Sequence, residues 1–326
     1  MQTTPNEAHS PAVRLVEVDH EYDGQRLDNF LLRLCKGVPK SHIYKAIRGG
    51  EVRVNKGRVS ADYRVALGDV VRIPPLRLPQ VVPKFVPSGH FPVVYEDDAL
   101  LVIDKPSGVA AHGGSGVSFG VIEQLRAARP ESRFLELAHR LDRETSGLLM
   151  IGKKRSALLA LHDALREGRS TKKYFALVEG DWVNDRQHIR LPLAKWTTRS
   201  GERRVKVAQD GQSAHTIVSL CQRYGGYSLV EAELRTGRTH QIRVHLAASG
   251  FPIVGDEKYG HDAVRETFSR QYDFRRMFLH AYSLEIAHPL TNEPLALRAP
   301  LPPACEKVLG QLRPAGQATS PKGRIR

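Results

Sequence analysis

The segment FLELAHRLDRETSGLLMIG, residues 134–152, sets a polar loop between two apolar runs. Residues 134–137 predict an extended run and residues 148–152 predict a buried strand, because both are short, apolar and bounded by polar residues. Asp142 lies within the polar loop, among His, Arg, Thr and Ser side chains. A loop held between two rigid elements is a common place for a reactive side chain. The competing interpretation is a turn in which Asp142 bonds its own backbone, and composition alone does not separate the two.

The flanking sequence predicts an α+β fold with a mixed, mainly antiparallel sheet. Helices are predicted at 121–129 and 156–167, and strands at 93–103, 174–179, 217–220, 228–235 and 283–287. Most of these strands follow one another without an intervening helix, which favours antiparallel pairing over a doubly wound parallel sheet.

The chain of 326 residues is longer than most single domains, so two domains are expected. Residues 14–76 predict a small domain, with helices at 25–34 and 41–48, Ser41 as the N-cap of the second, and strands at 52–54 and 70–73. The proline-rich residues 77–92 predict a semi-stiff linker, and residues 93–312 a larger second domain. Residues 1–13 and the basic tail 313–326 have little to bury and are expected to be disordered.

The net charge of +14 favours a polyanionic partner such as a nucleic acid, with a solvated basic surface as the alternative. Between residues 25 and 77, twelve Lys or Arg residues stand against four acids. Such an excess on a compact domain suits phosphate contacts. The candidate contacts are Lys40, Lys45, Arg48, Arg53, Lys56 and Arg58.

A second polar cluster, RTGRTHQIRVH at residues 235–245, holds Arg238, His240 and Arg243. Their donors suit a carboxylate, a phosphate or a base edge, and an Arg beside a buried Asp keeps that carboxylate ionised. Two histidines five residues apart, without a third ligand nearby, are a weak zinc motif, so no metal site is predicted. Tyr174, in the strand-like KKYFALV, is either ordinary core or a surface on which a base stacks.

Several classes of protein are disfavoured by the sequence. The three cysteines lie far apart and form no paired motif, which argues against disulfides and zinc fingers. The glycine-rich residues 110–116 lack the Gly-Lys-Ser/Thr ending of a phosphate loop, so no nucleotide cofactor is expected. No stretch approaches the ~20 apolar residues of a membrane span, and residues 1–12 carry no apolar signal core. A cytoplasmic protein is therefore expected.

The combination of blocks resembles the bacterial pseudouridine synthases that modify large-subunit ribosomal RNA and some tRNAs. The matching blocks are DKPSG (104–108), HRLD with TSG (139–147), KY (173–174), GRTHQIRVH (237–245) and FLHA (278–281). Residues 25–73 resemble the S4 RNA-binding domain, and the whole resemblance covers about residues 14–312. Three further stretches, 36–41, 112–116 and 129–130, are most similar to the synthase C type, which acts on 23S rRNA.

The resemblance implies roles for individual residues. Asp142 is expected to be the catalytic carboxylate, Tyr174 an active-site tyrosine and Arg243 the partner of Asp142. Arg140 is expected to help displace the target base, and Leu279 to pack near the uracil. The full set expected to bind substrate is His139, Arg140, Thr145, Arg238, His240 and Leu279.

The implied reaction breaks the C1′–N1 bond of a uridine and rejoins the same uracil through C5. It needs no cofactor, and the implied partner is 23S rRNA or the pre-ribosomal large subunit, bound by a monomeric enzyme. Asp142 can attack C1′, add to C6 or remove the 2′ proton, and the residues do not choose among these steps.

Alternative functions remain at this point. The nearest are synthases of the same family that act on another rRNA site or on tRNA. The more distant are a non-catalytic S4-type ribosome assembly factor and a hydrolase of RNA or nucleosides. A hydrolase normally needs a second carboxylate to activate water, and Glu144 is the one acid close to Asp142 in the sequence.

Overall fold

The computed structural model describes residues 13–35, 37–76, 86–114, 119–198 and 201–312. The chain divides into two compact units, residues 1–85 and 86–326, and each is described by itself. The ends expected to be disordered, apart from residue 13, and residues 77–85 of the expected linker lie outside the described residues.

The first unit combines a three-stranded antiparallel sheet with two helices. Its elements are β1 (Arg14–Glu17), α1 (Leu27–Leu34), α2 (Lys40–Arg48), β2 (Arg53–Val54) and β3 (Val70–Ile73), with strand order β1-β3-β2. Phe30 of α1 and Ile43 of α2 are fully buried in one core with Val71 of β3. The prediction that Ser41 caps α2 was wrong. The N-cap is Pro39, because its extended conformation ends the connection one residue before the helix begins.

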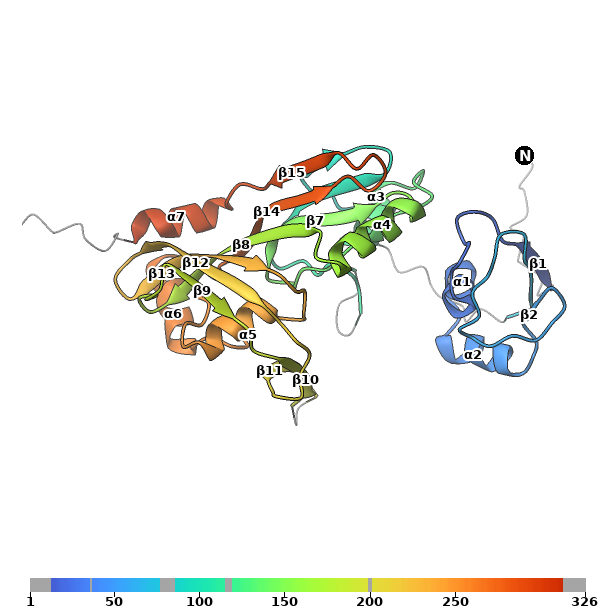
Figure 1. The fold of residues 1–326 in the computed structure, drawn as a ribbon, viewed down its shortest axis with the longest axis horizontal. Coiled ribbons are helices and arrows are strands. Elements are labelled where there is room, and N and C mark those ends of the chain that lie inside the picture. Colours follow the sequence, from blue (N-terminus) through green and yellow to red (C-terminus); the bar gives the residue numbers. More distant parts are fainter. Residues whose placement is uncertain (1–12, 36, 77–85, 115–118, 199–200, 313–326) are drawn as a thin grey trace, which may run out of the picture. The chain divides into compact units, whose positions relative to one another are not determined.

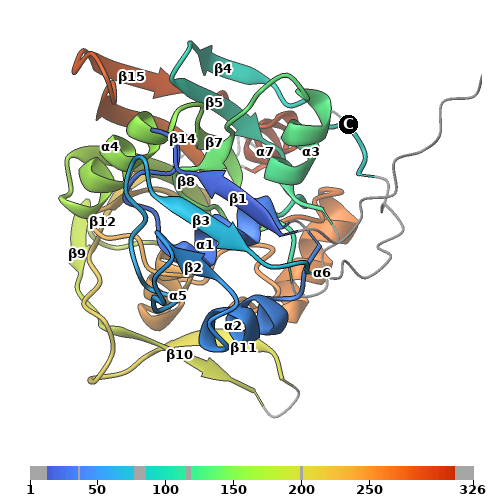
Figure 2. The ribbon, with the colours of Figure 1, turned by 90° about the vertical axis from the view of Figure 1, so that its right-hand side faces the viewer.

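The second unit is built on a ten-stranded sheet (Figures 1 and 2). The strand order is β4-β5-β7-β14-β8-β13-β12-β9, with β6 beside β7 and β15 beside β14. Its strands are β4 (Val93–Glu96), β5 (Leu100–Lys105), β6 (Glu136–Leu137), β7 (Ser146–Gly152), β8 (Ser170–Glu179), β9 (Arg186–Ile189), β12 (Thr216–Arg223), β13 (Tyr227–Leu234), β14 (Leu279–Ala287) and β15 (Pro294–Arg298). β7 and β14 run parallel and the other pairs are antiparallel, which confirms the predicted α+β fold.

Helices cover both faces of this sheet. They are α3 (Val121–Ala128), α4 (Arg155–Arg166), α5 (Gln241–Ala248), α6 (Asp262–Gln271) and α7 (Pro303–Gln311). α3 and α5 share a core with Leu149 and Ile151 of β7. The alternate residues Leu148 and Met150 pack with α4 on the opposite face. β7 is therefore buried along its whole length, which explains the unbroken apolar run that follows the polar loop.

A separate hairpin extends from the second unit beside α5 (Figures 1 and 2). It consists of β10 (Leu193–Thr197) and β11 (Arg203–Val207), paired antiparallel. Leu193 and Val205 bury their side chains in a small core with Val244 of α5. Among the described residues, no helix combines the length and the apolar content that a membrane crossing requires.

Gly147 lies where the parallel strands β7 and β14 meet. It is opposite Ala281 and has φ +110°, a conformation that L side chains rarely adopt. A Cβ added at this position would collide with the carbonyl oxygen of Ala281. The glycine of the TSG block is therefore required by the sheet.

We predict that Gly147→Ala lowers the free energy of unfolding of the second unit by roughly 3 kcal/mol. Gly168→Ala is the matched control, since Gly168 has φ +72° but nothing within 4 Å of an added Cβ. Its cost should stay at about 1 kcal/mol. Both tryptophans of the chain, Trp182 and Trp196, belong to this unit, so urea unfolding followed by tryptophan fluorescence measures the change. Equal losses in the two variants would contradict the steric explanation.

Candidate active site

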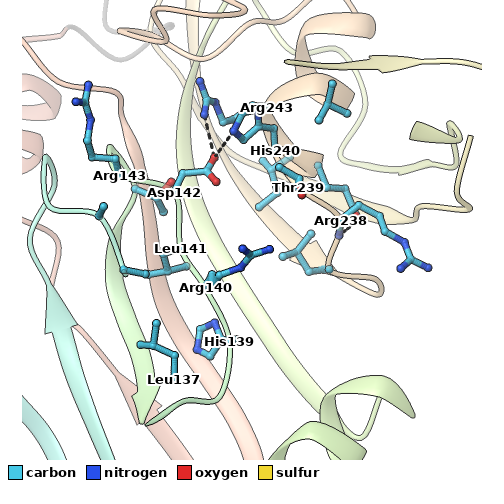
Figure 3. Close-up of a pocket in the computed structure, with 18 of the residues that line it drawn as sticks. Leu137, His139, Arg140, Leu141, Asp142, Arg143, Arg238, Thr239, His240 and Arg243 are labelled. Carbon is cyan, nitrogen blue, oxygen red and sulfur yellow. Dashed lines mark hydrogen bonds and ion pairs between the residues drawn. The ribbon is translucent and has the colours of Figure 1, made fainter. Parts of the chain in front are cut away.

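Asp142 faces a large open cavity in the second unit (Figure 3). Its volume is about 1450 Å³, above the roughly 300–1,000 Å³ of small-molecule pockets. The lining brings together all nine side chains that the sequence predicted here: His139, Arg140, Asp142, Thr145, Tyr174, Arg238, His240, Arg243 and Leu279. The six basic residues predicted to contact RNA all belong to the first unit, where each is exposed: Lys40, Lys45, Arg48, Arg53, Lys56 and Arg58.

The loop that carries Asp142 connects β6 to β7 and rests on a buried lysine. Nζ of Lys105, at the end of β5, donates to three backbone carbonyls, those of Pro106, Val109 and Arg143, at 2.8, 2.7 and 3.1 Å. Burial lowers the pKa of Lys105 to about 7. The bond to Arg143 fixes the backbone directly after Asp142. Sequence reasoning missed this role, although a lysine that ends an apolar strand was an available signal.

Two more hydrogen bonds shape the same loop. Ser107 Oγ donates to the carbonyl oxygen of Glu144 at 2.7 Å, so a second residue of the DKPSG block holds the loop. The N–H of Thr145 donates to the carbonyl oxygen of Asp142 at 3.2 Å and closes a tight turn. Thr145 is itself buried. The backbone around Asp142 is therefore fixed from below and from within.

Arg243 connects Asp142 to a second, deeply buried carboxylate. Its Nη1 donates to Oδ2 of Asp142 at 2.9 Å, while Nε and Nη2 both donate to Asp256 at 2.7 Å. The side chain of Asp256 is fully buried, and its Oδ1 also accepts backbone N–H groups from Lys258 and Tyr259. Although burial alone would raise it, these bonds hold the pKa of Asp256 below its usual range. Arg243 is thus locked in place with one N–H directed at Asp142.

Asp256 was not identified from the sequence. It lies 13 residues after Arg243 in a turn that no motif marked. The bidentate geometry alone reveals its importance, because Arg and a carboxylate match each other in two parallel bonds.

The N-terminus of α5 is fixed by Gln241. Its Oε1 accepts hydrogen bonds from Thr236 Oγ1 (2.7 Å) and from the N–H of Arg238 (3.0 Å). Its Nε2 donates to the carbonyl of His215 at 3.0 Å. The preceding residue, His240, adopts a left-handed conformation with φ +53°. This turn directs the ring of His240 toward the loop of Asp142 (Figure 3).

Tyr174 and Leu279 line the cavity from the sheet. Tyr174 lies on β8 between Ala232 of β13 and Ala281 of β14, whose small side chains share its face. These alanines leave space beside the ring on the cavity side. Burial, reinforced by the charge of Asp142, raises the pKa of the Tyr174 hydroxyl, so the ring stays neutral.

Three other predicted residues have distinct surroundings. Arg140 is exposed and extends into the cavity, with Nη1 3.4 Å from Nε2 of His112 (Figure 3). Nε2 of His139 accepts the N–H of Met150 at 3.1 Å, and burial lowers the pKa of His139 to about 3. Arg238 is exposed, and its Nε donates to a backbone carbonyl at 3.1 Å. Their contacts with substrate stay predictions.

The lining of the cavity is strongly basic. Twelve of its residues are Lys or Arg and three are acids. The cations are Arg126, Arg140, Arg143, Arg166, Lys172, Lys195, Arg203, Arg204, Arg235, Arg238, Arg243 and Lys258. Such a surface suits a polymer of phosphates. Within the described ranges, no group of three or more His, Cys, Asp or Glu is placed to hold a metal ion.

We predict that Asp256→Asn lowers the free energy of unfolding by about 3 kcal/mol, because it leaves the buried Arg243 with half of its compensating charge. The matched control is Asp262→Asn. Asp262 pairs with Arg265 on an exposed helix surface, and its loss should cost less than about 1 kcal/mol. Urea unfolding monitored by tryptophan fluorescence measures both variants. A loss at Asp256 no larger than that at Asp262 would contradict the locking role.

Comparison with known sequences agrees with this geometry. Residues 99–248 match the family described as RNA pseudouridylate synthase, and residues 25–71 match the S4 domain. The ribosomal large subunit pseudouridine synthase C of Pasteurella multocida is 48% identical over 309 residues, covering 93% of this chain and 94% of that protein. The protein of the same name from Escherichia coli K12 is 47% identical over 315 residues, covering 94% and 98%.

Solved structures show the same fold. Human RNA pseudouridylate synthase domain containing 1 is 28% identical, with a TM-score of 0.57 over 71% of this chain and 91% of that chain. Human RNA pseudouridylate synthase domain containing 4 is 24% identical, with a TM-score of 0.57 over 68% and 93%. From these matches, and most directly from its identity to the curated relatives over more than nine tenths of its length, the chain belongs to the RNA pseudouridylate synthase family.

Proposed function

We propose that this protein converts uridine to pseudouridine in 23S ribosomal RNA, with Asp142 as its catalytic carboxylate. The observation that carries the proposal is the pairing of Asp142 with a locked Arg243 in a large basic cavity. The names of the relatives, which are ribosomal large subunit synthases, support the choice of substrate. Another rRNA site or a tRNA is disfavoured by the same names.

The target uridine must leave its stack to reach Asp142. Its uracil then fits beside Tyr174, with Leu279 packing against it and Arg140 occupying the space that the base vacates in the RNA. Tyr174 is the surface that keeps the detached base in place, because an aromatic ring holds a base by stacking.

The reaction balances without water or a cofactor. The C1′–N1 bond breaks and a C1′–C5 bond forms, while the hydrogen on C5 leaves to solvent and N1 gains a proton. Arg243 keeps Asp142 ionised and oriented for any of the three first steps: attack on C1′, addition to C6 or removal of the 2′ proton. The side chain of Asp142 is 27% exposed, so its carboxylate is accessible to a nucleotide in the cavity.

A hydrolase is disfavoured by the other acids around the cavity. Among the described lining residues these are Glu123 and Glu136. Glu123 accepts backbone N–H groups at the start of α3, and Glu136 pairs with Arg126 at 2.8 Å. Glu144 pairs with its neighbour Arg143, and no second carboxylate is free to activate water opposite Asp142 in the described part of the chain.

The first unit is proposed to bind the RNA that surrounds the target. Residues 14–76 are assigned to RNA binding, residues 77–92 to a linker and residues 93–312 to catalysis. The exposure of all six predicted contacts supports this assignment, as does the S4 match. A non-catalytic assembly factor would need this surface but not the Asp142–Arg243 pair. We further propose that the protein acts in the cytoplasm as a monomer, on 23S rRNA or the pre-ribosomal large subunit, without a nucleotide cofactor.

We predict that Asp142→Asn lowers conversion at least roughly 1,000-fold, since it removes the reacting charge and leaves the shape of the cavity unchanged. Conversion is measured as tritium released from 23S rRNA that carries 5-tritiated uridine, and RNA binding is measured in parallel. Glu144→Gln is the control and should convert within about threefold of wild type. Full conversion by Asp142→Asn would contradict the proposal, and free uracil among the products would indicate a hydrolase.

We predict that replacing Lys40, Lys45 and Arg48 by Gln reduces the slope of log K against log salt for rRNA binding by roughly 2–3, because each lost phosphate contact removes nearly one released counterion. The control removes the same charge elsewhere, by changing the exposed Arg270, Arg275 and Lys307 to Gln. Filter binding at several salt concentrations measures both slopes. Equal slopes in the two triple variants would show that the first unit has no special role in RNA binding.

A further inference from the structure

The ring of His240 lies between Asp142 and Tyr259. Nε2 is 3.8 Å from Oδ2 of Asp142, and Nδ1 is 2.8 Å from the hydroxyl oxygen of Tyr259. The two rings meet edge-on, with centroids 5.6 Å apart. A left-handed conformation is uncommon outside glycine, so the position of this ring is set by the surrounding structure.

The hydrogen bonds of Tyr259 determine which nitrogen of His240 carries the proton. The Tyr259 hydroxyl oxygen already accepts the N–H of Val205 at 2.9 Å. The single hydrogen of the hydroxyl is then directed to Nδ1 of His240, which accepts it. A neutral imidazole whose Nδ1 is an acceptor carries its own hydrogen on Nε2, the nitrogen that faces Asp142.

The opposite tautomer is disfavoured by Asp142. With the hydrogen on Nδ1, the lone pair of Nε2 would face the negatively charged Oδ2 of Asp142 at 3.8 Å. Two electron-rich atoms would then face each other across a partly buried site, which is repulsive.

A protonated ring is disfavoured by the other groups around it. The charged or titratable groups that face His240 are Asp142, Asp256, Arg243, Lys258 and Tyr259. Burial lowers the pKa of His240, and the two cations work in the same direction against the two carboxylates. The ring therefore stays neutral near pH 7, beside an Arg243 that already supplies a full positive charge.

We infer that Tyr259 holds His240 as the neutral tautomer with its proton on Nε2, which makes His240 a second, uncharged donor at the catalytic carboxylate. The inference rests on the proposed role of Asp142. Tyr259 is a positioning residue, because it acts through His240 and not on the substrate. The gap of 3.8 Å closes by a small shift of the ring when substrate is bound, as donor distances in unliganded sites often do.

A neutral donor suits the chemistry better than a second cation. Cleavage of the C1′–N1 bond builds positive charge on the sugar, as in other glycosidic cleavages. A charged His240 beside Arg243 would oppose that charge and weaken the negative potential of Asp142. An uncharged N–H orients the carboxylate without adding to the positive charge.

The tautomer is tested directly by ¹⁵N NMR of the full-length wild-type protein labelled on its histidine rings. At pH 7 the signal that disappears in His240→Gln is expected to show a bare Nδ1 and a protonated Nε2. Observation of the Nδ1–H tautomer or of the doubly protonated ring would overturn the inference. This measurement does not depend on activity, so it remains decisive if the Tyr259 variant folds poorly.

The role in catalysis is tested with Tyr259→Phe, which removes the donor to Nδ1. Without that donor the neutral ring loses stabilisation, the pKa of His240 rises and the acid limb of the pH–rate profile moves upward by roughly one unit. Conversion at pH 7 is expected to fall at least about 10-fold, with KM changed by less than about twofold. An unchanged pH profile, or a loss confined to KM, would contradict the positioning role.

The matched control is Tyr282→Phe. Its hydroxyl also bonds a partner, Glu231, but its ring stacks on Phe175, on the sheet face opposite Tyr174. This variant is expected to keep the wild-type profile. If the wild-type protein releases no tritium, the proposed function fails. If wild type is active and Tyr259→Phe behaves like Tyr282→Phe, the role of Tyr259 alone fails.

Discussion

The locked guanidinium of Arg243 is the interaction on which the site depends. A buried cation is unfavourable unless it is paired, and Asp256 supplies that pair with two parallel bonds in a fully buried position. Asp256 therefore has the structural role, and the remaining N–H of Arg243 is left to set the charge and direction of Asp142. One cation serves two carboxylates because their environments differ, one sealed in the core and the other open to the cavity.

The sheet and the loop supports translate this charge arrangement into a rigid geometry. Lys105 holds the backbone after Asp142 from β5, and Gly147 lets β7 approach β14 directly after the loop. Tyr174 comes to the same cavity from β8, the other neighbour of β14. The blocks that looked unrelated along the chain are thus neighbours across one part of the sheet, and each one fixes a different side of the cavity.

Much of the fold could be predicted from the sequence where apolar periodicity was strong. The predicted helix 121–129 matches α3 to within one residue, and the predicted strand 228–235 is shifted by one residue from β13. The hairpin β10–β11 was not predicted, because its strands bury little beyond Leu193 and Val205 and are otherwise rich in charged residues. β15 begins with a proline and alternates exposed and half-buried residues, so it gave no clear pattern.

The site could be predicted as a set of residues but not as a network. All nine predicted residues line one cavity, since the motifs that carry them flank strands that the fold brings together. Asp256 and Tyr259 were not predicted, because their partners lie on other elements and a turn of mixed residues has no periodicity to mark them. Lys105 was visible only as part of a block, and its three carbonyl partners are a property of the folded loop.

The two bonds of Arg243 also differ in how they respond to thermal opening. Its bond to Asp256 closes a loop of 13 residues, whereas its bond to Asp142 spans 101. The longer closure costs about 2 kcal/mol more in chain entropy, so the contact with Asp142 is the one that opens first. When the loop of Asp142 swings away, Arg243 keeps a partner and no bare cation is left in the core. A catalytic loop can therefore move to admit a bulky polymer without destabilising the domain that carries it.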